Sequence, residues 1–196
     1  RLMPMAYLRD ATALARRHGL ATHLDGARLF NAAVGLGGDP RANAREMAEL
    51  FDSVSVCFSK GLGAPAGSAL VGSAELIARA KRVRKMAGGT MRQAGILAAA
   101  AMHALDHHID RLADDHARAR RLAEGLQGLP GVTVQMPQTN MVFIDLPRER
   151  AAAAVAALRE QGVLSTGLYQ LRLVTHLDVN DEQIDQAIAA LRRALH

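Results

Sequence analysis

The segment SVSVCFSKGLGAPAGSALVGS, residues 53–73, contains the pattern that decides the fold. Residues 53–59 are rich in β-branched and apolar side chains, which predicts a strand. Lys60 follows directly, and the glycine-rich turn GLGAPAG at 61–67 separates it from a second predicted strand at 68–73. A lysine at the end of a buried strand is costly unless its amine reaches water or takes part in chemistry.

Helices and strands alternate around this segment. We expect helices at about 4–18, 40–49 and 74–86 and further strands at 21–27 and 68–73. Typical boundary residues support these helices: Gly19 follows the end of the first, Pro40 is in the first turn of the second, and Ser73 caps the start of the third. The alternation predicts an α/β fold with a mostly parallel sheet, in which the strand at 68–72 runs antiparallel.

The pattern changes after a long helical region at about 92–127, which we expect to be bent near 107–110. Beyond it, the sequence predicts strands at 131–137, 140–147, 163–168 and 171–177 and helices at 148–162 and 180–195. We therefore expect a large α/β domain at 1–105, a connecting helix at 106–128 and a small α+β domain at 129–196.

Composition excludes several classes of function. Hydrophobic residues make up 49% of the chain and aromatic residues 3%, which is typical of a globular protein with an aliphatic core. The formal charge is +5, but no basic run is interleaved with aromatic residues, so no nucleic-acid partner is expected. No apolar window is long enough for a membrane span. The single cysteine, Cys57, favours a reducing compartment and thus a cytoplasmic location.

Two polar groups follow predicted strands. Asp25 stands near the end of the predicted strand at 21–27, and Arg28 comes three residues later. Lys60 directly follows the predicted strand at 53–59. Taken singly, Asp25 has a plain reading as a turn residue beside Gly26, and Lys60 as a side chain that extends to solvent. Together, a carboxylate and a lysine at neighbouring strand ends match pyridoxal phosphate chemistry. The carboxylate keeps the pyridine nitrogen protonated and the lysine forms an imine with the aldehyde.

Four motifs carry a family resemblance, and they span most of the chain. They are HLDGARLFNAAVGLG (23–37), CFSKGLGAPAGSALVGS (57–73), RKMAGGTMRQAGILAAAA (84–101) and LRLVTHLDV (171–179). In this order they resemble the low-specificity L-threonine aldolases, which are pyridoxal-phosphate enzymes of the aspartate-aminotransferase-like group, fold type I. The resemblance implies cleavage of L-threonine or L-allo-threonine to glycine and an aldehyde, by a dimer or tetramer with active sites at subunit interfaces.

The resemblance also implies roles for particular residues. Lys60 would form the Schiff base with the cofactor, and Asp25 would be the partner of its pyridine nitrogen. Arg28 and Arg172 would bind the carboxylate of the amino-acid substrate, with Arg28 also at the cofactor. Lys85 and Arg92 would lie near the cofactor across a subunit boundary. No metal is implied.

The chain departs from the family pattern in two places. Family members carry a further N-terminal segment with a phosphate-binding turn, a histidine stacked on the cofactor ring and a serine near the carboxylate. This chain begins with Arg1 rather than an initiator methionine, and an amphipathic helix is already under way after Pro4, so we expect it to be the C-terminal portion of a longer polypeptide with an N-terminally truncated sheet. Thr90 replaces a glycine of the family's GGG turn, where a positive φ would be strained for threonine.

Three readings of function therefore compete: a threonine aldolase, another pyridoxal-phosphate lyase or transferase that performs β-elimination, and a fragment that is not catalytically competent by itself.

The remaining histidines are open to two readings each. His103 and His107 lie at i and i+4 and form a possible metal pair, or are solvent-exposed helix residues. His176 shares a strand face with Arg172 and lies near the carboxylate pocket or makes a structural hydrogen bond.

Overall fold

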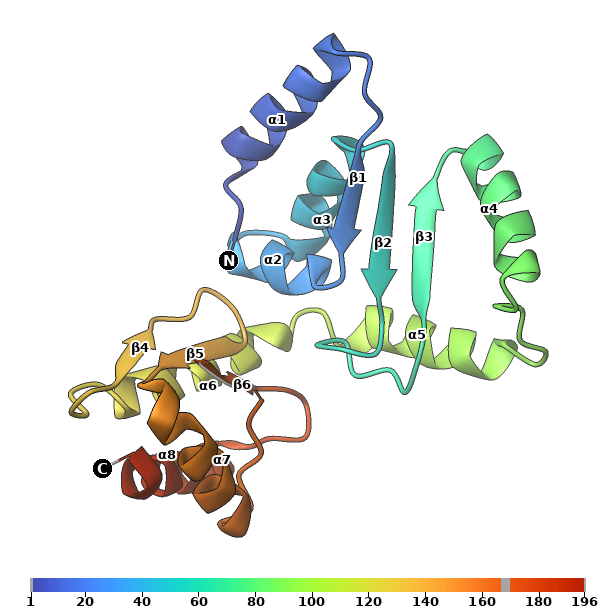
Figure 1. The fold of residues 1–196 in the computed structure, drawn as a ribbon. Helices are drawn as coiled ribbons and strands as arrows, with labels where there is room; N and C mark the ends of the chain where they lie inside the picture. The colour runs from blue at the N-terminus through green and yellow to red at the C-terminus, as the bar shows by residue number, and fades with distance from the viewer. Residues whose placement is uncertain (1, 167–169, 196) are drawn as a thin grey trace. The chain divides into compact units, whose positions relative to one another are not determined.

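The computed structural model describes residues 2–166 and 170–195 (Figure 1). It divides the chain into two units, Leu2–Arg111 and Leu112–His196, and this division falls inside the segment 106–128 that was predicted to connect two domains. None of the helices in the described ranges has both the length and the apolar character that crossing a membrane requires.

The N-terminal unit contains a three-stranded sheet and five helices among its described residues. In chain order, the elements are α1 (Met5–Arg17), β1 (His23–Gly26), α2 (Leu29–Gly35), α3 (Pro40–Glu49), β2 (Ser53–Cys57), β3 (Ser68–Gly72), α4 (Ala74–Met86) and α5 (Gly95–His107). The strand order is β1-β2-β3. β1 and β2 are parallel, whereas β2 and β3 are antiparallel, so parallel pairing is confined to the first two strands.

The predicted helix boundaries are confirmed by local contacts. The Asp39 side chain accepts a hydrogen bond from the Arg41 amide at the start of α3, where Pro40 is the first helical residue. Ser73 Oγ accepts a hydrogen bond from the Leu76 amide, 3.2 Å away, and so caps α4. The short helix α2 was not predicted, because its seven residues give too little periodicity and Arg28, its N-cap residue, makes no side-chain cap.

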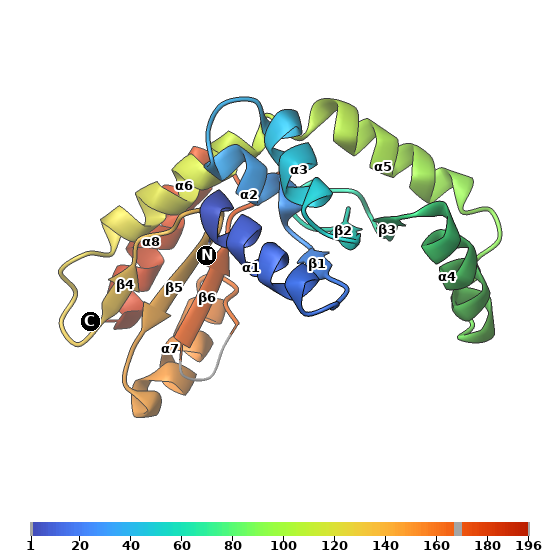
Figure 2. The same cartoon turned by 90° about the horizontal axis from the view of Figure 1, so that it is seen from above.

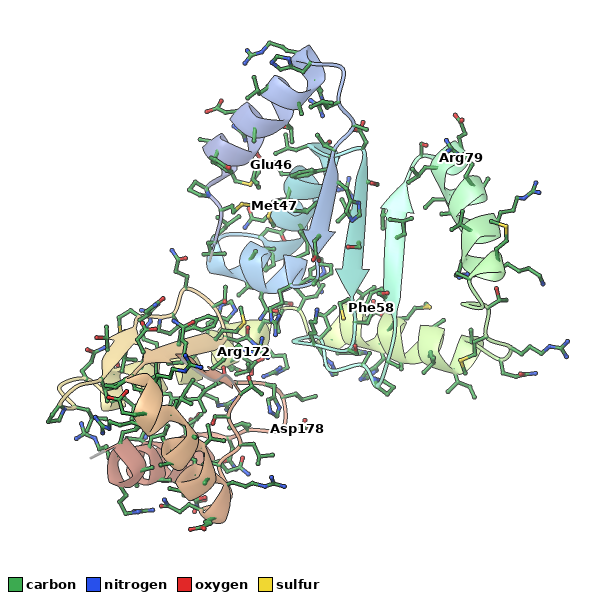
Figure 3. All side chains as sticks on the ribbon, viewed as in Figure 1. Glu46, Met47, Phe58, Arg79, Arg172 and Asp178 are labelled. Carbon is green, nitrogen blue, oxygen red and sulfur yellow. The ribbon has the colours of Figure 1, made fainter. Side chains whose placement is uncertain are left out.

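One face of this sheet is covered and the other is open. Helices α1, α2 and α3 pack on one face, as Figures 1 and 2 show. The buried residues of this core are Leu8, Leu29, Ala33, Ala44, Met47, Val54 and Val56. Arg9 of α1 also forms an ion pair with Glu46 of α3, labelled in Figure 3. Because side chains alternate along a strand, Asp25 of β1 and Ser55 of β2 lie on the opposite face.

Over its described residues, 112–166 and 170–195, the C-terminal unit contains a three-stranded sheet and three helices. Its elements are α6 (Leu112–Gly125), β4 (Thr133–Gln135), β5 (Met141–Asp145), α7 (Arg148–Glu160), β6 (Gln170–Val174) and α8 (Asp181–Leu195). The strand order is β4-β5-β6 and both pairings are antiparallel. Asn180 and Gln183 form a reciprocal capping box, with two hydrogen bonds of 2.9 Å, at the start of α8. The predicted α+β character of this part is confirmed.

Two predictions for this region need correction. The helical region at 92–127 is two helices, α5 and α6, because residues 108–111 interrupt it where a bend was predicted. The strand predicted at 163–168 is absent over 163–165, and Thr166 forms only an isolated bridge with Arg172; residues 167 and 168 lie outside the described residues. The reason is local: Gly162 has a φ of +76°, and the Val163 amide donates to the Leu158 carbonyl to close α7.

The core of the C-terminal unit lies between its sheet and its helices. Val142 and Ile144 of β5 and Leu171 of β6 are fully buried and face α6, α7 and α8. Leu191 of α8 is also fully buried in this cluster. The opposite face of the sheet carries the polar side chains of Asp145, Gln170 and Arg172 together with Met141 and Phe143, so each unit presents one covered and one open sheet face.

Replacing Leu191 with alanine tests this core. We expect Leu191→Ala to lower the free energy of unfolding by about 2–5 kcal/mol, since it removes buried methyl groups and leaves a cavity. Leu164→Ala is the matched control, because the Leu164 side chain is 77% exposed, and it should change stability by less than about 0.5 kcal/mol. Urea denaturation of both variants measures the difference, and equal losses would contradict the described packing.

Candidate active site

Asp25 lies at the carboxyl end of β1, on the open face of the N-terminal sheet. It is exposed and pairs in register with Ser55 of β2. Its Oδ1 accepts a hydrogen bond from the Ala27 amide, 3.1 Å away, which fixes the carboxylate beside its own turn. No described lysine or arginine forms an ion pair with Asp25, so the carboxylate can take an external cationic donor.

Lys60 lies in a hydrogen-bonded loop that follows β2. Phe58, at the end of the strand in Figure 3, donates its amide to the Gly67 carbonyl and accepts from the Ala64 amide, each over 3.0 Å. The Gly63 amide donates to the Lys60 carbonyl over 2.9 Å, and Gly63 has a φ of +73° that favours glycine. The backbone around Lys60 is therefore fixed while its side chain is exposed.

The parallel pairing brings the two segments to one edge of the sheet. The carboxyl ends of parallel strands meet at the same edge, where α/β proteins bind ligands. Asp25 lies near the carboxyl end of β1, and Lys60 follows β2 by three residues, so both are at this edge. Gly26, the last residue of β1, pairs with Val56 of β2, and a Cβ at Gly26 would lie 2.7 Å from the Ser55 carbonyl oxygen. Glycine is therefore required for the strands to approach this closely.

The amino ends of the same strands are held by Thr22 and Asp52. The Thr22 amide and hydroxyl donate to Asp52 Oδ2 over 2.7 and 2.9 Å. The hydrogen bond from the Thr22 amide, followed by that from its hydroxyl, lowers the pKa of Asp52 below its ordinary value of 3.8, and Arg16 lowers it further. This contact fixes the strand register from the end opposite Asp25 and Lys60.

The other predicted residues of the N-terminal unit are spread over different elements. Arg28 is half-buried at the N-cap of α2, close in sequence to Asp25. Lys85 is exposed in the last turn of α4, which packs on β3, and Arg92 is exposed just before α5. Thr90 does not have a positive φ, so no strain arises there. Gln93, with a φ of 52°, takes the left-handed conformation in this turn instead.

Arg172 belongs to the C-terminal unit and is exposed on the open face of its sheet (Figure 3). Its Nε donates to Thr166 Oγ1 over 3.2 Å. The nearby carboxylate of Asp145 is occupied, because it accepts from Gln135 and Gln170 over 2.9 and 2.7 Å. Within the described residues Arg172 pairs with no carboxylate, so its guanidinium is available to an external one.

The histidines that the sequence singled out make ring contacts and hydrogen bonds with nearby residues. The rings of His103 and His107 lie with centroids 4.4 Å apart, but no group of three potential metal ligands exists in the described part of the chain. His176 makes a structural contact with Asp178, whose backbone amide lies 3.3 Å from its Nδ1. Sequence reasoning missed His108, whose Nδ1 lies 2.7 Å from the Leu62 carbonyl oxygen, since no sequence signal links residues so far apart.

Comparison with known proteins identifies the family. The family described as beta-eliminating lyase matches residues 1–149 of the chain. The chain belongs to the beta-eliminating lyase family. The low-specificity L-threonine aldolase of Escherichia coli O157:H7 is 45% identical over 195 residues, which are 100% of this chain and 57% of the relative. Low-specificity L-threonine aldolase 1 of Arabidopsis thaliana is 39% identical over 202 residues, which are 100% of this chain and 55% of the relative. The resemblance predicted from the motifs is thus confirmed.

The fold of this beta-eliminating lyase family member is shared with solved structures. A threonine aldolase from Leishmania major superposes with a TM-score of 0.77 at 23% identity, over 98% of this chain and 57% of that chain. This likeness confirms the predicted fold type I class. The chain spans somewhat more than half the length of the curated relatives it matches.

Asp52→Asn tests the contact that fixes the strand register. The folded state lowers the pKa of Asp52, so the charged carboxylate contributes stability above the ordinary value of 3.8, and that contribution is lost as pH falls through the lower folded pKa. We expect the variant to be less stable than the wild type at pH 7, with a difference that shrinks to near zero in strong acid.

Urea denaturation between pH 2 and pH 7 measures this difference. Thr22→Ala is the companion variant, because it removes the hydroxyl donor and leaves the backbone donor, and we expect a smaller loss with the same pH dependence. A difference for Asp52→Asn that stays constant across the whole range would contradict the role given to the charge.

Proposed function

We propose that the protein containing this chain is a pyridoxal-phosphate-dependent aldolase that cleaves β-hydroxy-α-amino acids such as L-threonine and L-allo-threonine to glycine and an aldehyde. The observation that carries the proposal is the pairing of β1 with β2, which brings Asp25 and the Lys60 loop to one sheet edge. The names of the relatives support the choice of substrate.

The residues present at this edge fit the cofactor. Asp25 offers an exposed carboxylate without an ion-pair partner among the described residues, which suits a protonated pyridine nitrogen. Lys60 offers an exposed amine on a fixed backbone, and Ser55 and Cys57 of β2 lie on the same sheet face as Asp25. When bound, pyridoxal phosphate supplies the electron sink for the bond that breaks.

Each residue then has a separate task. Lys60 holds the cofactor covalently, and Asp25 keeps the proton on the ring nitrogen. Arg28 and Arg172 bind the substrate carboxylate, since a planar guanidinium can donate two parallel hydrogen bonds to it. This grip orients the Cα–Cβ bond of the substrate. Lys85 and Arg92 contact the cofactor from a neighbouring subunit.

We also propose that the protein is a cytoplasmic homodimer or homotetramer without a nucleic-acid partner. Large apolar side chains of α4, α5 and the turn between them are more than half exposed, which is typical of a surface that a partner covers. They are Val83, Met86, Met91, Ile96 and Met102. The free Cys57 supports the reducing location.

A second candidate reaction is β-elimination, which the description of the family favours. Aldol cleavage releases glycine and an aldehyde, whereas elimination releases ammonia and a keto acid, so product analysis separates the two. A third candidate, that this chain alone is not competent, follows from the part of the relatives that it does not match. Saturable tight binding of pyridoxal phosphate to the isolated chain would exclude it.

Lys60→Ala tests the central assignment. We expect loss of the visible absorbance of the lysine-bound cofactor and a fall in turnover by several orders of magnitude, because no other described amine lies in the Lys60 loop. Lys81→Ala in α4 is the control, since Lys81 is exposed and has no proposed role. A full-length Lys60→Ala protein that kept both absorbance and turnover would refute the proposal.

Arg172→Lys tests the carboxylate grip. Lysine keeps the charge but loses the paired donors, and a charge-assisted hydrogen bond contributes about 1.5–3 kcal/mol. We therefore expect KM for the amino acid to rise about tenfold to a hundredfold, with cofactor absorbance unchanged. Arg120→Lys, at an exposed position of α6, should leave KM unchanged. An unaltered KM in Arg172→Lys would remove Arg172 from the site.

A further inference from the structure

A side-chain hydrogen bond joins the end of α5 to the Lys60 loop. His108, the C-cap residue of α5, has its Nδ1 2.7 Å from the Leu62 carbonyl oxygen. A carbonyl oxygen only accepts hydrogen bonds, so Nδ1 must carry the proton and donate. The residues belong to the same unit, although they are far apart in sequence.

The acceptor lies inside the turn that carries the candidate reactive lysine. Leu62 is two residues after Lys60, its side chain is 3% exposed, and the turn is closed by the Gly63 amide and the Lys60 carbonyl. The loop's other described hydrogen bonds, between Phe58 and both Ala64 and Gly67, are internal to it. The bond from His108 therefore links the loop to a neighbouring helix, in addition to the packing of the buried residues Leu62 and Ala64.

The C-terminal end of α5, which carries His108, is itself fixed by hydrogen bonds from α3. Arg41 of α3 donates to the Asp110 carboxylate over 3.3 Å and to the Leu105 carbonyl over 3.4 Å. The His108 amide donates to the Ala104 carbonyl over 2.9 Å, and Ala104 is 1% exposed. The donor thus sits on an element whose position is fixed by packing and by α3.

A neighbouring ring limits the orientation of the donor. The ring of His103 lies edge-on to that of His108, with centroids 5.3 Å apart and planes at 90°. The ring of His107 is tilted against that of His103, with the two planes at 47°. The half-buried His108 ring has little freedom to turn away, so its Nδ1 remains directed at Leu62.

We propose that His108 is a positioning residue for Lys60: its Nδ1–H holds the Leu62 carbonyl and thereby keeps the lysine amine aligned for covalent attachment to an aldehyde-bearing cofactor. The functional half of this inference rests on the proposed role of Lys60. The structural half, that His108 orders the loop, stands on the hydrogen bond itself.

Hydrogen–deuterium exchange of the full-length protein tests the structural half without any cofactor. His108→Ala and His108→Leu both remove the donor, and leucine keeps most of the side-chain volume. We expect the amides of Gly63 and Ala64, which close the loop, to exchange about three- to tenfold faster in both, as the loss of one net hydrogen bond implies. His107→Ala is the matched control and should not change this exchange.

The rate of covalent attachment of pyridoxal phosphate, followed by absorbance, tests the functional half. We expect a three- to tenfold slower attachment in His108→Leu, and recovery in His108→Asn, because the asparagine Nδ2 can donate from a similar position.

Exchange and attachment that both stay within twofold of the wild type in His108→Leu would overturn the inference, as would failure of His108→Asn to restore either. Faster exchange with unchanged attachment would overturn the positioning role. If Lys60→Ala still attached the cofactor, the proposed function would fail while the exchange result would stand.

Discussion

The parallel pairing of β1 with β2 is the constraint on which the rest of the N-terminal unit depends. It brings two segments of the chain, each ending in a polar group, to the same sheet edge. Gly26 permits the close approach, because any Cβ would meet the Ser55 carbonyl at 2.7 Å. The Thr22–Asp52 contact fixes the other end of the pair, so a slip in register would cost hydrogen bonds at the amino ends and create a clash at the carboxyl ends.

Both units use a sheet in the same way. Helices cover one face and build a core of aliphatic side chains, which is how a chain with 3% aromatic residues still forms two stable cores. The open face then carries the polar groups, Asp25 in one unit and Arg172 in the other. A carboxylate and a guanidinium are thus presented by separate units, each on a strand rather than on a loop.

Much of the fold was predictable where the signal is local. Capping residues such as Ser73 and Asn180 act on their own helix, so α4 and α8 begin close to where the sequence indicated. The prediction failed where a local pattern was outweighed. The segment at 163–168 was predicted to be a strand, but the closure of α7 uses the Val163 amide, and α2 is too short to show a period.

The sequence by itself determined which chemical groups are present, which elements carry Asp25 and Lys60, and the family to which the motifs belong. Only the tertiary structure decided that these groups share one sheet edge, which sheet faces are open, and that His108 reaches Leu62. The physical reason is the distance along the chain over which each interaction acts. Propensity and capping act within a few residues, whereas strand pairing and the His108 contact join segments far apart in the chain, and their energy is gained only once the intervening residues have folded.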